Sequence, residues 1–178
     1  MRFILKNMQK YNILVLSDSH GNRREIERIM SYQIEPLDAV IHLGDGCNDI
    51  DRRSISESCA LYSVRGNCDF FTAGDDIPYE RTISFGDFTF LIMHGHKFFV
   101  KNDIRYAVEY AAGKSVDVLL YGHTHVPLEN YFSEGTTIGN TVLSKPLYVF
   151  NPGSVGKYPS SFGNIQINDR SILFGFSK

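Results

Sequence analysis

The sequence predicts an α/β fold in which parallel strands carry polar residues to one edge of a sheet. Short apolar runs typical of buried strands alternate with segments of helical periodicity. Ligand-type residues follow five of these runs, beginning at Asp18, Asp45, Asn67, His94 and His123, so successive groups lie 27, 22, 27 and 29 residues apart. Each interval has about the length of one strand with its return connection. We therefore expect these side chains to meet at the carboxyl ends of the strands, where open α/β sheets bind ligands.

The first half of the chain contains the first predicted strand and helix. Residues 12–16 include four successive apolar residues, which predicts a buried strand. Asn22 suits a helix N-cap, and the helix that follows is expected to end near Tyr32. Two further apolar runs, 39–43 and 60–64, predict strands, and residues 48–58 predict a helix from a weaker periodicity.

The second half is expected to be mostly β-structure. Residues 82–85 and 88–93 are rich in β-branched and aromatic side chains and flank Gly86-Asp87, which predicts a hairpin. Apolar residues at helical spacing from Ile104 to Ala111 predict a helix that stops at Gly113, a suitable C′ residue. The remaining predicted strands are 116–121, 128–132, 147–151, 164–167 and 172–176.

Length and composition indicate one globular domain. The 178 residues fit a single domain over 1–178, with residues 1–7 open to interpretation as an N-terminal extension. Hydrophobic residues make up 43% of the chain and charged residues 21%, close to ordinary globular usage. This composition argues against global disorder.

Charge and hydrophobicity argue against two classes of partner, nucleic acids and membranes, and the cysteine content indicates the redox compartment. The chain has 18 Lys and Arg against 20 Asp and Glu, a net charge of -2, and no basic run, so we expect no general nucleic-acid binding. No apolar stretch approaches the roughly 20 residues of a membrane helix, so we expect no membrane association. The three cysteines are too few for a disulfide framework, which favours a reducing compartment, the cytoplasm.

Seven side chains at the predicted strand ends have the chemistry of metal ligands. They comprise two carboxylates, one amide and four imidazoles, too many for one ion. Two ions that share a carboxylate would each have four protein ligands. One such division gives the first ion Asp18, His20, Asp45 and His125, and the second ion Asp45, Asn67, His94 and His123.

A pair of divalent ions has the chemistry required for phosphoryl transfer. Two ions about 3.5–4 Å apart can hold a bridging hydroxide and clamp the oxygens of an in-line displacement. Their four positive charges exceed the two carboxylate charges, so the pocket would attract a phosphate ester. The mixed N/O ligand set favours Mn, Fe, Ni, Co or Zn over an all-oxygen Mg or Ca site.

Five short motifs lie at the predicted strand ends: D-x-H at 18–20, GD at 44–45, GN at 66–67, HGH at 94–96 and GHTH at 122–125. In order and spacing they resemble the motifs of the calcineurin-like metallophosphoesterases, specifically a small bacterial and archaeal phosphodiesterase branch with a GNCD motif. The similarity spans residues 12–156 and includes NPGSVG at 151–156. It implies two facing mixed β-sheets flanked by helices, a four-layer sandwich, the same seven ligands, and Mn as the first choice of metal.

Two departures from the phosphoprotein-phosphatase branch bear on the substrate. Asp49 stands where that branch has an arginine that helps to hold a phosphate dianion, and Cys68 stands where it has a histidine that assists the leaving group. Losing a cation and gaining an anion disfavours dianionic monoesters, so we expect a small phosphodiester as substrate. Either His96 substitutes for the missing histidine, or turnover is best with good leaving groups.

The resulting hypothesis is a phosphodiesterase that acts through a metal-bridging hydroxide. Asp45 bridges the ions, Asn67 also contacts the phosphate, Cys68 lines the substrate site, and His96 acts near the leaving group. The alternatives are a phosphomonoesterase and a non-catalytic protein-interaction scaffold, because a retromer subunit shares this fold with a degraded site. The complete ligand set argues against the scaffold. Association into a homo-oligomer is left open.

Several nearby residues have a plainer interpretation. His42 alternates with apolar residues and is expected to be buried and hydrogen-bonded, supporting Asp45 from behind. Cys47 and Cys68 are interpreted as small, partly buried thiols near the metals. Four aromatic residues can form a rim for a base or aryl group, although packing in the core or against a subunit is favoured: Phe70, Phe71, Phe98 and Phe99.

Overall fold

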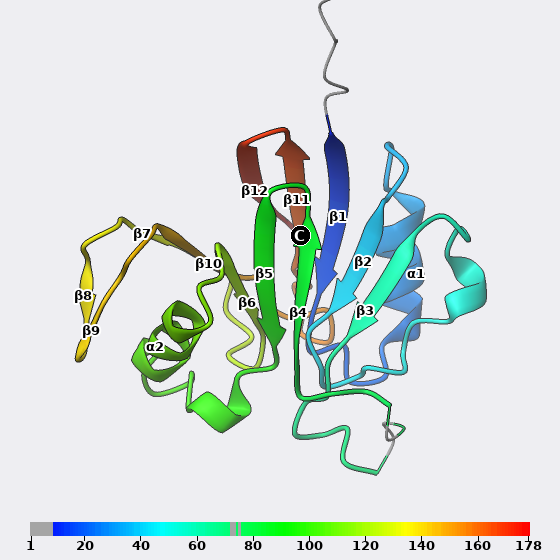
Figure 1. Cartoon of the computed structure of the whole chain (residues 1–178). Coiled ribbons are helices and arrows are strands. Elements are labelled where there is room, and N and C mark those ends of the chain that lie inside the picture. Colours follow the sequence, from blue (N-terminus) through cyan, green and yellow to red (C-terminus); the bar gives the residue numbers. More distant parts are fainter. Residues whose placement is uncertain (1–8, 72–73, 75) are drawn as a thin grey trace, which may run out of the picture.

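Two five-stranded mixed β-sheets face each other in the computed structural model, which describes residues 9–71, 74 and 76–178 (Figure 1). The first sheet has the order β12-β11-β1-β2-β3, in which β1, β2 and β3 run parallel and β11 pairs antiparallel with β1 and β12. Its strands are β1 (Lys10–Leu16), β2 (Ala39–His42), β3 (Ala60–Ser63), β11 (Phe162–Asn168) and β12 (Ser171–Ser177).

The second sheet has the order β4-β5-β6-β10-β7. Strands β5, β6 and β10 run parallel, β4 and β5 form the predicted hairpin, and β7 pairs antiparallel with β10 at the edge. The strands are β4 (Glu80–Phe85), β5 (Phe88–Met93), β6 (Val118–Tyr121), β7 (Leu128–Phe132) and β10 (Leu147–Asn151). Every strand expected from the sequence is present, with bounds that differ by at most two residues.

Apolar side chains divide the molecule into four layers. Alternate residues of the two sheets, among them Ile41 and Phe90, pack together between the sheets. The outer face of the first sheet packs on α1 (Arg23–Ser31), and the outer face of the second packs on α2 (Arg105–Gly113). The order is helix, sheet, sheet, helix, which confirms the expected sandwich. Among the described residues, no helix is long and apolar enough to cross a membrane.

Helix α1 begins and ends where the sequence predicted. The side chain of Asn22 accepts a hydrogen bond from the Glu25 N–H, and Tyr32 is the C-cap. At the end of α2 the prediction was wrong in detail. Gly113 is the last helical residue rather than C′, and it is Ser115 that adopts left-handed backbone, with φ 53°.

The helix expected over residues 48–58 does not form. Only the 3-10 helix η1 (Arg52–Ser54) lies there, capped by Asp51. Ile50 and Ile55 both pack beneath the first sheet, but on an α-helix residues five apart would point about 140° away from each other. An irregular path lets both side chains reach the core.

Three short elements had no clear sequence signal. They are the two-stranded ribbon of β8 (Thr137–Ile138) and β9 (Thr141–Val142), and the 3-10 helix η2 (His96–Phe98). Each is too short to show a periodicity. The expected N-terminal extension, residues 1–7, lies outside the described residues.

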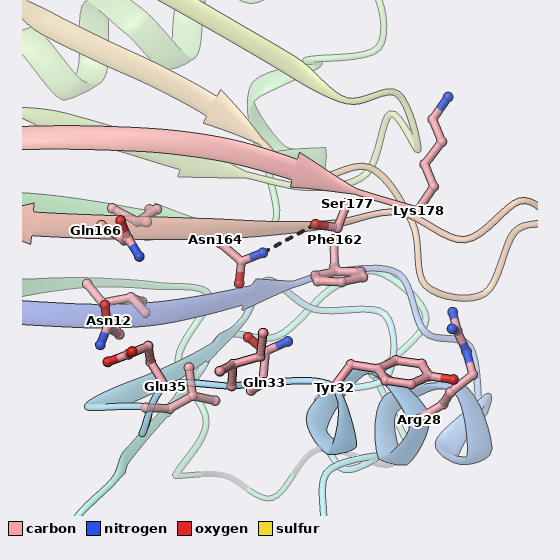
Figure 2. A pocket seen from close by; sticks show the side chains of 14 residues that line it. Asn12, Arg28, Tyr32, Gln33, Glu35, Phe162, Asn164, Gln166, Ser177 and Lys178 are labelled. Carbon is pink, nitrogen blue, oxygen red and sulfur yellow. Dashed lines mark hydrogen bonds between the residues drawn. The ribbon is translucent and has the colours of Figure 1, made fainter.

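A polar groove of about 530 Å³ lies between α1 and the outer face of the first sheet (Figure 2). Its walls include Asn12 from β1, Gln33 from the segment after α1, and Asn164 and Gln166 from β11. None of its lining residues belongs to the five motif loops. The groove is therefore separate from the cluster of ligand-type residues.

Candidate metal centre

Five loops meet at one end of the sandwich because their strands run in the same direction. Strands β1, β2, β3, β5 and β6 all end at the lower edge in Figure 1. The residues that follow them include Asp18, Asp45, Asn67, His94 and His123. The expected gathering of ligand-type residues at strand ends is confirmed for the six residues whose ligand atoms group together: Asp18, His20, Asp45, His94, His123 and His125.

Five of the seven predicted ligands have left-handed backbone. Their φ angles are 52° for Asp18, 47° for His20, 54° for Asp45, 68° for His123 and 59° for His125. For residues other than glycine this conformation costs about 1 kcal/mol or more each. Such strain persists where the surrounding structure imposes it, and it clusters at functional sites.

Backbone hydrogen bonds between loops impose this conformation. The Asp18 N–H donates to the Gly44 carbonyl and the His20 N–H donates to the Asp45 carbonyl, each at 3.0 Å. The Ser154 hydroxyl, within the NPGSVG segment, donates to the Asp18 carbonyl at 2.9 Å. The loop after β1 is thus held from two sides, by the loop after β2 and by the segment after β10.

The loops after β2 and β3 approach so closely that glycine is required. A Cβ on Gly44 would lie 2.6 Å from the Gly66 nitrogen, and Gly44 also has a φ of 94°. A Cβ on Gly66 would lie 2.1 Å from an Asp45 carboxylate oxygen. The GD and GN motifs therefore carry glycine for steric reasons as well as for backbone freedom.

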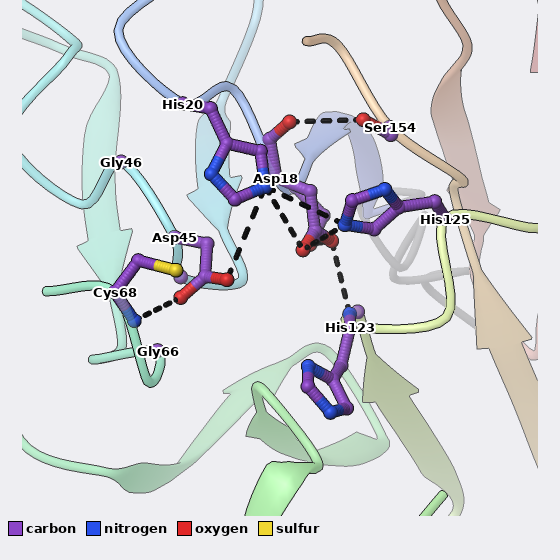
Figure 3. A network of polar contacts seen from close by, with 12 residues as sticks. Asp18, His20, Asp45, Gly46, Gly66, Cys68, His123, His125 and Ser154 are labelled. Carbon is purple, nitrogen blue, oxygen red and sulfur yellow. Dashed lines mark hydrogen bonds and ion pairs between the residues drawn. The ribbon is translucent and has the colours of Figure 1, made fainter. Parts of the chain in front are cut away.

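The first group of ligand atoms comes from Asp18, His20 and His125 (Figure 3). Asp18 Oδ1 lies 3.1 Å from His125 Nε2 and 4.0 Å from His20 Nε2. The other oxygen, Oδ2, accepts hydrogen bonds from the Ser17 hydroxyl and the His123 N–H. Among the described residues Oδ1 has no hydrogen-bond partner, although Asp18 is fully buried. A buried, unpaired carboxylate oxygen aimed at imidazole nitrogens fits a cation between them.

The second group comes from Asp45, His94 and His123. His94 Nε2 lies 3.4 Å from Asp45 Oδ2 and 3.1 Å from His123 Nδ1. His94 Nδ1 lies 2.7 Å from the Leu43 carbonyl, an acceptor only, so Nδ1 carries the proton and Nε2 is left to ligate. Asp45 Oδ2 is also 4.0 Å from His20 Nε2, so this oxygen reaches both groups.

Burial and neighbouring charges set the protonation of these side chains. Burial raises the pKa of Asp45, but His94 and the Cys68 N–H outweigh it and hold that pKa below its usual range. Burial lowers the pKa of His94, but Asp45 and Asp18 outweigh it and raise that pKa above its ordinary value. Burial and the nearby His94 lower the pKa of His123 to about 4. The shifts for Asp45 and His123 favour the ionised carboxylate and the neutral imidazole that bind metal, whereas His94, held protonated by the carboxylates, would release its proton when a cation binds.

Asn67 and Cys68 are exposed to solvent beside the ligand cluster. The Asn67 amide donates to the Cys68 sulfur at 3.3 Å, and its role as a ligand stays a prediction. The Cys68 N–H donates to Asp45 Oδ1 at 2.7 Å, and its sulfur groups with ligand atoms of His20 and Asp45. Burial and the Asp45 carboxylate raise the pKa of the Cys68 thiol to about 11. Cys47, by contrast, is buried.

His96 lies beside the cluster. Its ring centroid is 5.4 Å from that of His94 and 6.2 Å from that of His123. Its Nδ1 is buried without a hydrogen-bond partner among the described residues. The position is compatible with a role near a leaving group, which stays a prediction.

Sequence reasoning missed the organising role of Asp69. This carboxylate is 2% exposed and accepts hydrogen bonds from four backbone N–H groups at 2.8–3.3 Å. The only signal was its place as the last residue of GNCD. The side chain joins the loops after β2 and β3 by contacting Asp45, Gly46, Cys47 and Gly66.

His42 and Asp49 support the loop after β1. The expected burial of His42 is confirmed, and burial lowers its pKa to about 4. Its hydrogen bonds involve the Gly44 N–H and the Ser19 hydroxyl rather than the Asp45 carboxylate. Asp49 accepts hydrogen bonds from the Ser19 hydroxyl at 2.6 Å and the Gly21 N–H at 2.8 Å.

The favoured packing of the four phenylalanines was in the core or against a subunit; the core is wrong for three of them, and the contact with a subunit stays a prediction. Phe70, Phe71 and Phe99 are 67%, 93% and 66% exposed. Only Phe98 packs against the core, with its ring centroid 4.8 Å from that of Tyr110.

The geometry agrees with comparisons with known proteins. The family model of the calcineurin-like phosphoesterase superfamily domain matches residues 11–169. The chain is 32% identical over 145 residues to the probable metallophosphoesterase YsnB of Bacillus subtilis, covering 81% of this chain and 75% of that protein. It is 28% identical over 196 residues to phosphodiesterase YfcE of Escherichia coli, covering 90% and 95%.

Solved structures share the fold. A conserved protein of Streptococcus pneumoniae, itself a predicted phosphoesterase, superposes with a TM-score of 0.71 at 26% identity, covering 95% of this chain and 90% of that one. Vacuolar protein sorting 29 of Cryptosporidium parvum superposes with a TM-score of 0.65 at 16% identity, covering 95% and 97%. The second likeness concerns the fold alone.

Replacing Asp69 with Asn should destabilise the protein by about 2–4 kcal/mol, because an amide has one acceptor oxygen for four buried N–H donors. Burial raises the pKa of Asp69, but the four N–H groups hold it below its usual range. The carboxylate therefore stabilises the fold above the unfolded pKa of about 3.9, and this contribution is lost as pH falls through the lower folded pKa.

Urea unfolding at pH 7 and at lower pH measures this effect. The difference between wild type and Asp69→Asn should shrink as the medium is acidified. Asp87→Asn is the matched control, because Asp87 is exposed in the β4–β5 turn and should change stability by less than about 0.5 kcal/mol. Equal stability of Asp69→Asn and wild type at pH 7 would contradict the organising role.

Proposed function

Because the chain belongs to the calcineurin-like phosphoesterase superfamily, we propose that it is a divalent-metal-dependent phosphodiesterase with a dinuclear centre. Family membership makes it a phosphoester hydrolase. The observation that carries the proposal is the pair of ligand groups, Asp18-His20-His125 and Asp45-His94-His123, with Asp45 Oδ2 within 4.0 Å of imidazole nitrogens from both.

In this proposal each group holds one ion. Asp45 contributes to both ions, and Asn67 completes the second. When bound there, divalent ions would supply a hydroxide nucleophile near neutral pH and would neutralise charge on the phosphoryl oxygens. The imidazole and carboxylate donors fit Mn, Fe, Ni, Co or Zn. Mn is the first choice because of the resemblance to the family.

The residues of the chain keep these ligands in position. The Cys68 N–H donates a hydrogen bond to Oδ1 of Asp45, so Oδ2 faces the imidazole of His94. The Leu43 carbonyl fixes the tautomer of His94. Asn67 is exposed at the mouth of the centre and is proposed to contact the phosphate. His96 is proposed to act on the leaving-group side.

Two observations favour a diester over a monoester. No arginine stands at position 49, and the relative YfcE is named a phosphodiesterase. The argument from the negative charge of Asp49 is weaker than the sequence suggested. Its carboxylate is engaged by Ser19 and Gly21 and lies 3.6 Å from the Arg23 guanidinium.

The alternatives are a phosphomonoesterase and an interaction scaffold of the same fold. Vacuolar protein sorting 29 shares the fold, so the scaffold is retained as an alternative. The grouped ligand atoms favour hydrolysis. All three cysteines, Cys47, Cys59 and Cys68, are free, which supports a reducing compartment such as the cytoplasm.

Metal-stripped protein should hydrolyse neither bis(p-nitrophenyl) phosphate nor p-nitrophenyl phosphate until Mn²⁺ is added. With Mn²⁺, kcat/KM should be higher for the diester, because the site has no arginine at position 49 for a dianion. Release of p-nitrophenol measures both reactions. Metal-dependent turnover of neither ester would refute the hydrolase proposal, and faster turnover of the monoester would refute the diester preference.

Asp45→Asn should lower kcat at least about 100-fold, because the neutral amide weakens the ligation of both ions. The fold should survive, since the amide oxygen can still accept from the Cys68 N–H. Asp51→Asn is the control, because Asp51 caps η1 at the surface and Asn caps equally well. Mn-dependent kinetics and circular dichroism measure both variants. Full activity of Asp45→Asn would show that this carboxylate does not serve the metals.

A further inference from the structure

A pocket with aromatic walls lies between η2 and α2. Its volume is about 650 Å³, within the range of about 300–1,000 Å³ typical of small-molecule sites. Phe98 and Phe99 come from the segment that follows the HGH motif, and Tyr106 and Tyr110 come from α2. The polar part of the lining is a cation, an amide and two carboxylates, from Lys97, Asn102, Asp103 and Glu109. The lining thus combines four aromatic rings with four polar side chains, and aromatic walls with placed polar groups are typical of small-molecule sites.

Direct contacts connect this pocket to the candidate metal centre. Lys97 belongs to the pocket wall, and its Nζ lies 3.2 Å from the centroid of the Tyr79 ring. The Tyr79 ring is 5.8 Å from that of His96, which is 5.4 Å from that of His94. The pocket wall and the predicted metal ligands are thus neighbours, joined through Tyr79 and His96.

The backbone holds Phe99 out of the core. Phe99 is 66% exposed and has left-handed backbone, with φ 54° and ψ 32°, a conformation that bulky residues rarely adopt. Its carbonyl accepts hydrogen bonds from the N–H groups of Asn102 and Asp103, which keep the turn closed. Tyr106 is 57% exposed on the same pocket. Two large rings are thus presented to solvent beside a concave surface, with a strained backbone at one of them.

We infer that this pocket binds the nucleobase of a small nucleoside phosphodiester, an inference that rests on the proposed function. Phe99 and Tyr106 offer exposed ring faces on which a base can stack. The Asn102 amide has both a donor and an acceptor for the edge of a base. The net charge of -2 and the lack of a basic run favour a small nucleotide over a long nucleic acid.

Two substrates with the same leaving group test this inference. They are thymidine 5′-(p-nitrophenyl phosphate) and methyl p-nitrophenyl phosphate, which differ only in the nucleoside. The Mn-loaded wild type should prefer the nucleoside ester about tenfold in kcat/KM, the size of one base-stacking contact. Phe99→Gly and Tyr106→Ala should lose this preference and keep the turnover of the methyl ester. Glycine is chosen at position 99 because it accepts the left-handed backbone.

Tyr32→Ala is the matched control, because Tyr32 is 64% exposed at the end of α1 and outside this pocket. The Tyr32→Ala variant should prefer the nucleoside ester over the methyl ester in kcat/KM as strongly as the wild type does. Calorimetric titration with thymidine 5′-phosphate gives a readout without turnover, and Phe99→Gly should weaken binding about tenfold. Failure to hydrolyse the methyl ester would count against the proposed function, while the titration would still decide the inference.

Three results would overturn the inference: equal kcat/KM for the two esters, a preference that both pocket variants retain, or unchanged binding of thymidine 5′-phosphate by Phe99→Gly. Size-exclusion chromatography adds a further outcome. If the pocket substitutions reduce the mass of the particle and leave the preference intact, the aromatic surface is a contact between copies of the chain, and the inference is wrong.

Discussion

The contact between the loops after β2 and β3 is the constraint on which the candidate site depends. The two loops pass so closely at Gly44 and Gly66 that neither position has room for a Cβ. Asp69 lies within this contact and accepts N–H groups from both loops. The contact brings the Cys68 N–H to Asp45 Oδ1 and directs Oδ2 to imidazole nitrogens of both ligand groups. Asp18 Oδ1 likewise lies 3.1 Å from His125 Nε2 and 3.9 Å from His94 Nε2, so both carboxylates are near imidazole nitrogens of both groups.

The same loops combine strained backbone with buried negative charge. Five predicted ligands have left-handed backbone, and Asp18 Oδ1 is buried without a hydrogen-bond partner among the described residues. Bound cations would stabilise this end of the sandwich, because they pair with the unpartnered oxygen and offset the two carboxylates. Stability and metal affinity are therefore expected to be coupled here.

Much of the fold and most of the ligand cluster could be predicted from the sequence, because both follow from local patterns. Apolar runs indicated the strands, and motifs such as D-x-H at 18–20 indicated the ligands at their ends. The exceptions depend on long-range geometry. The helix over 48–58 was wrong because Ile50 and Ile55 reach the core by an irregular path. The role of Asp69 depends on a neighbouring loop, and no pattern within GNCD reveals that contact.

Asp45 is proposed to join the two ligand groups into a centre for two ions. Calorimetric titration of metal-stripped protein with Mn²⁺, together with elemental analysis of the product, counts the bound ions. Two ions should bind to the wild type, and one should remain in His125→Ala, because His125 belongs to the first group alone. A single ion in the wild type, or the loss of both ions in His125→Ala, would contradict this account.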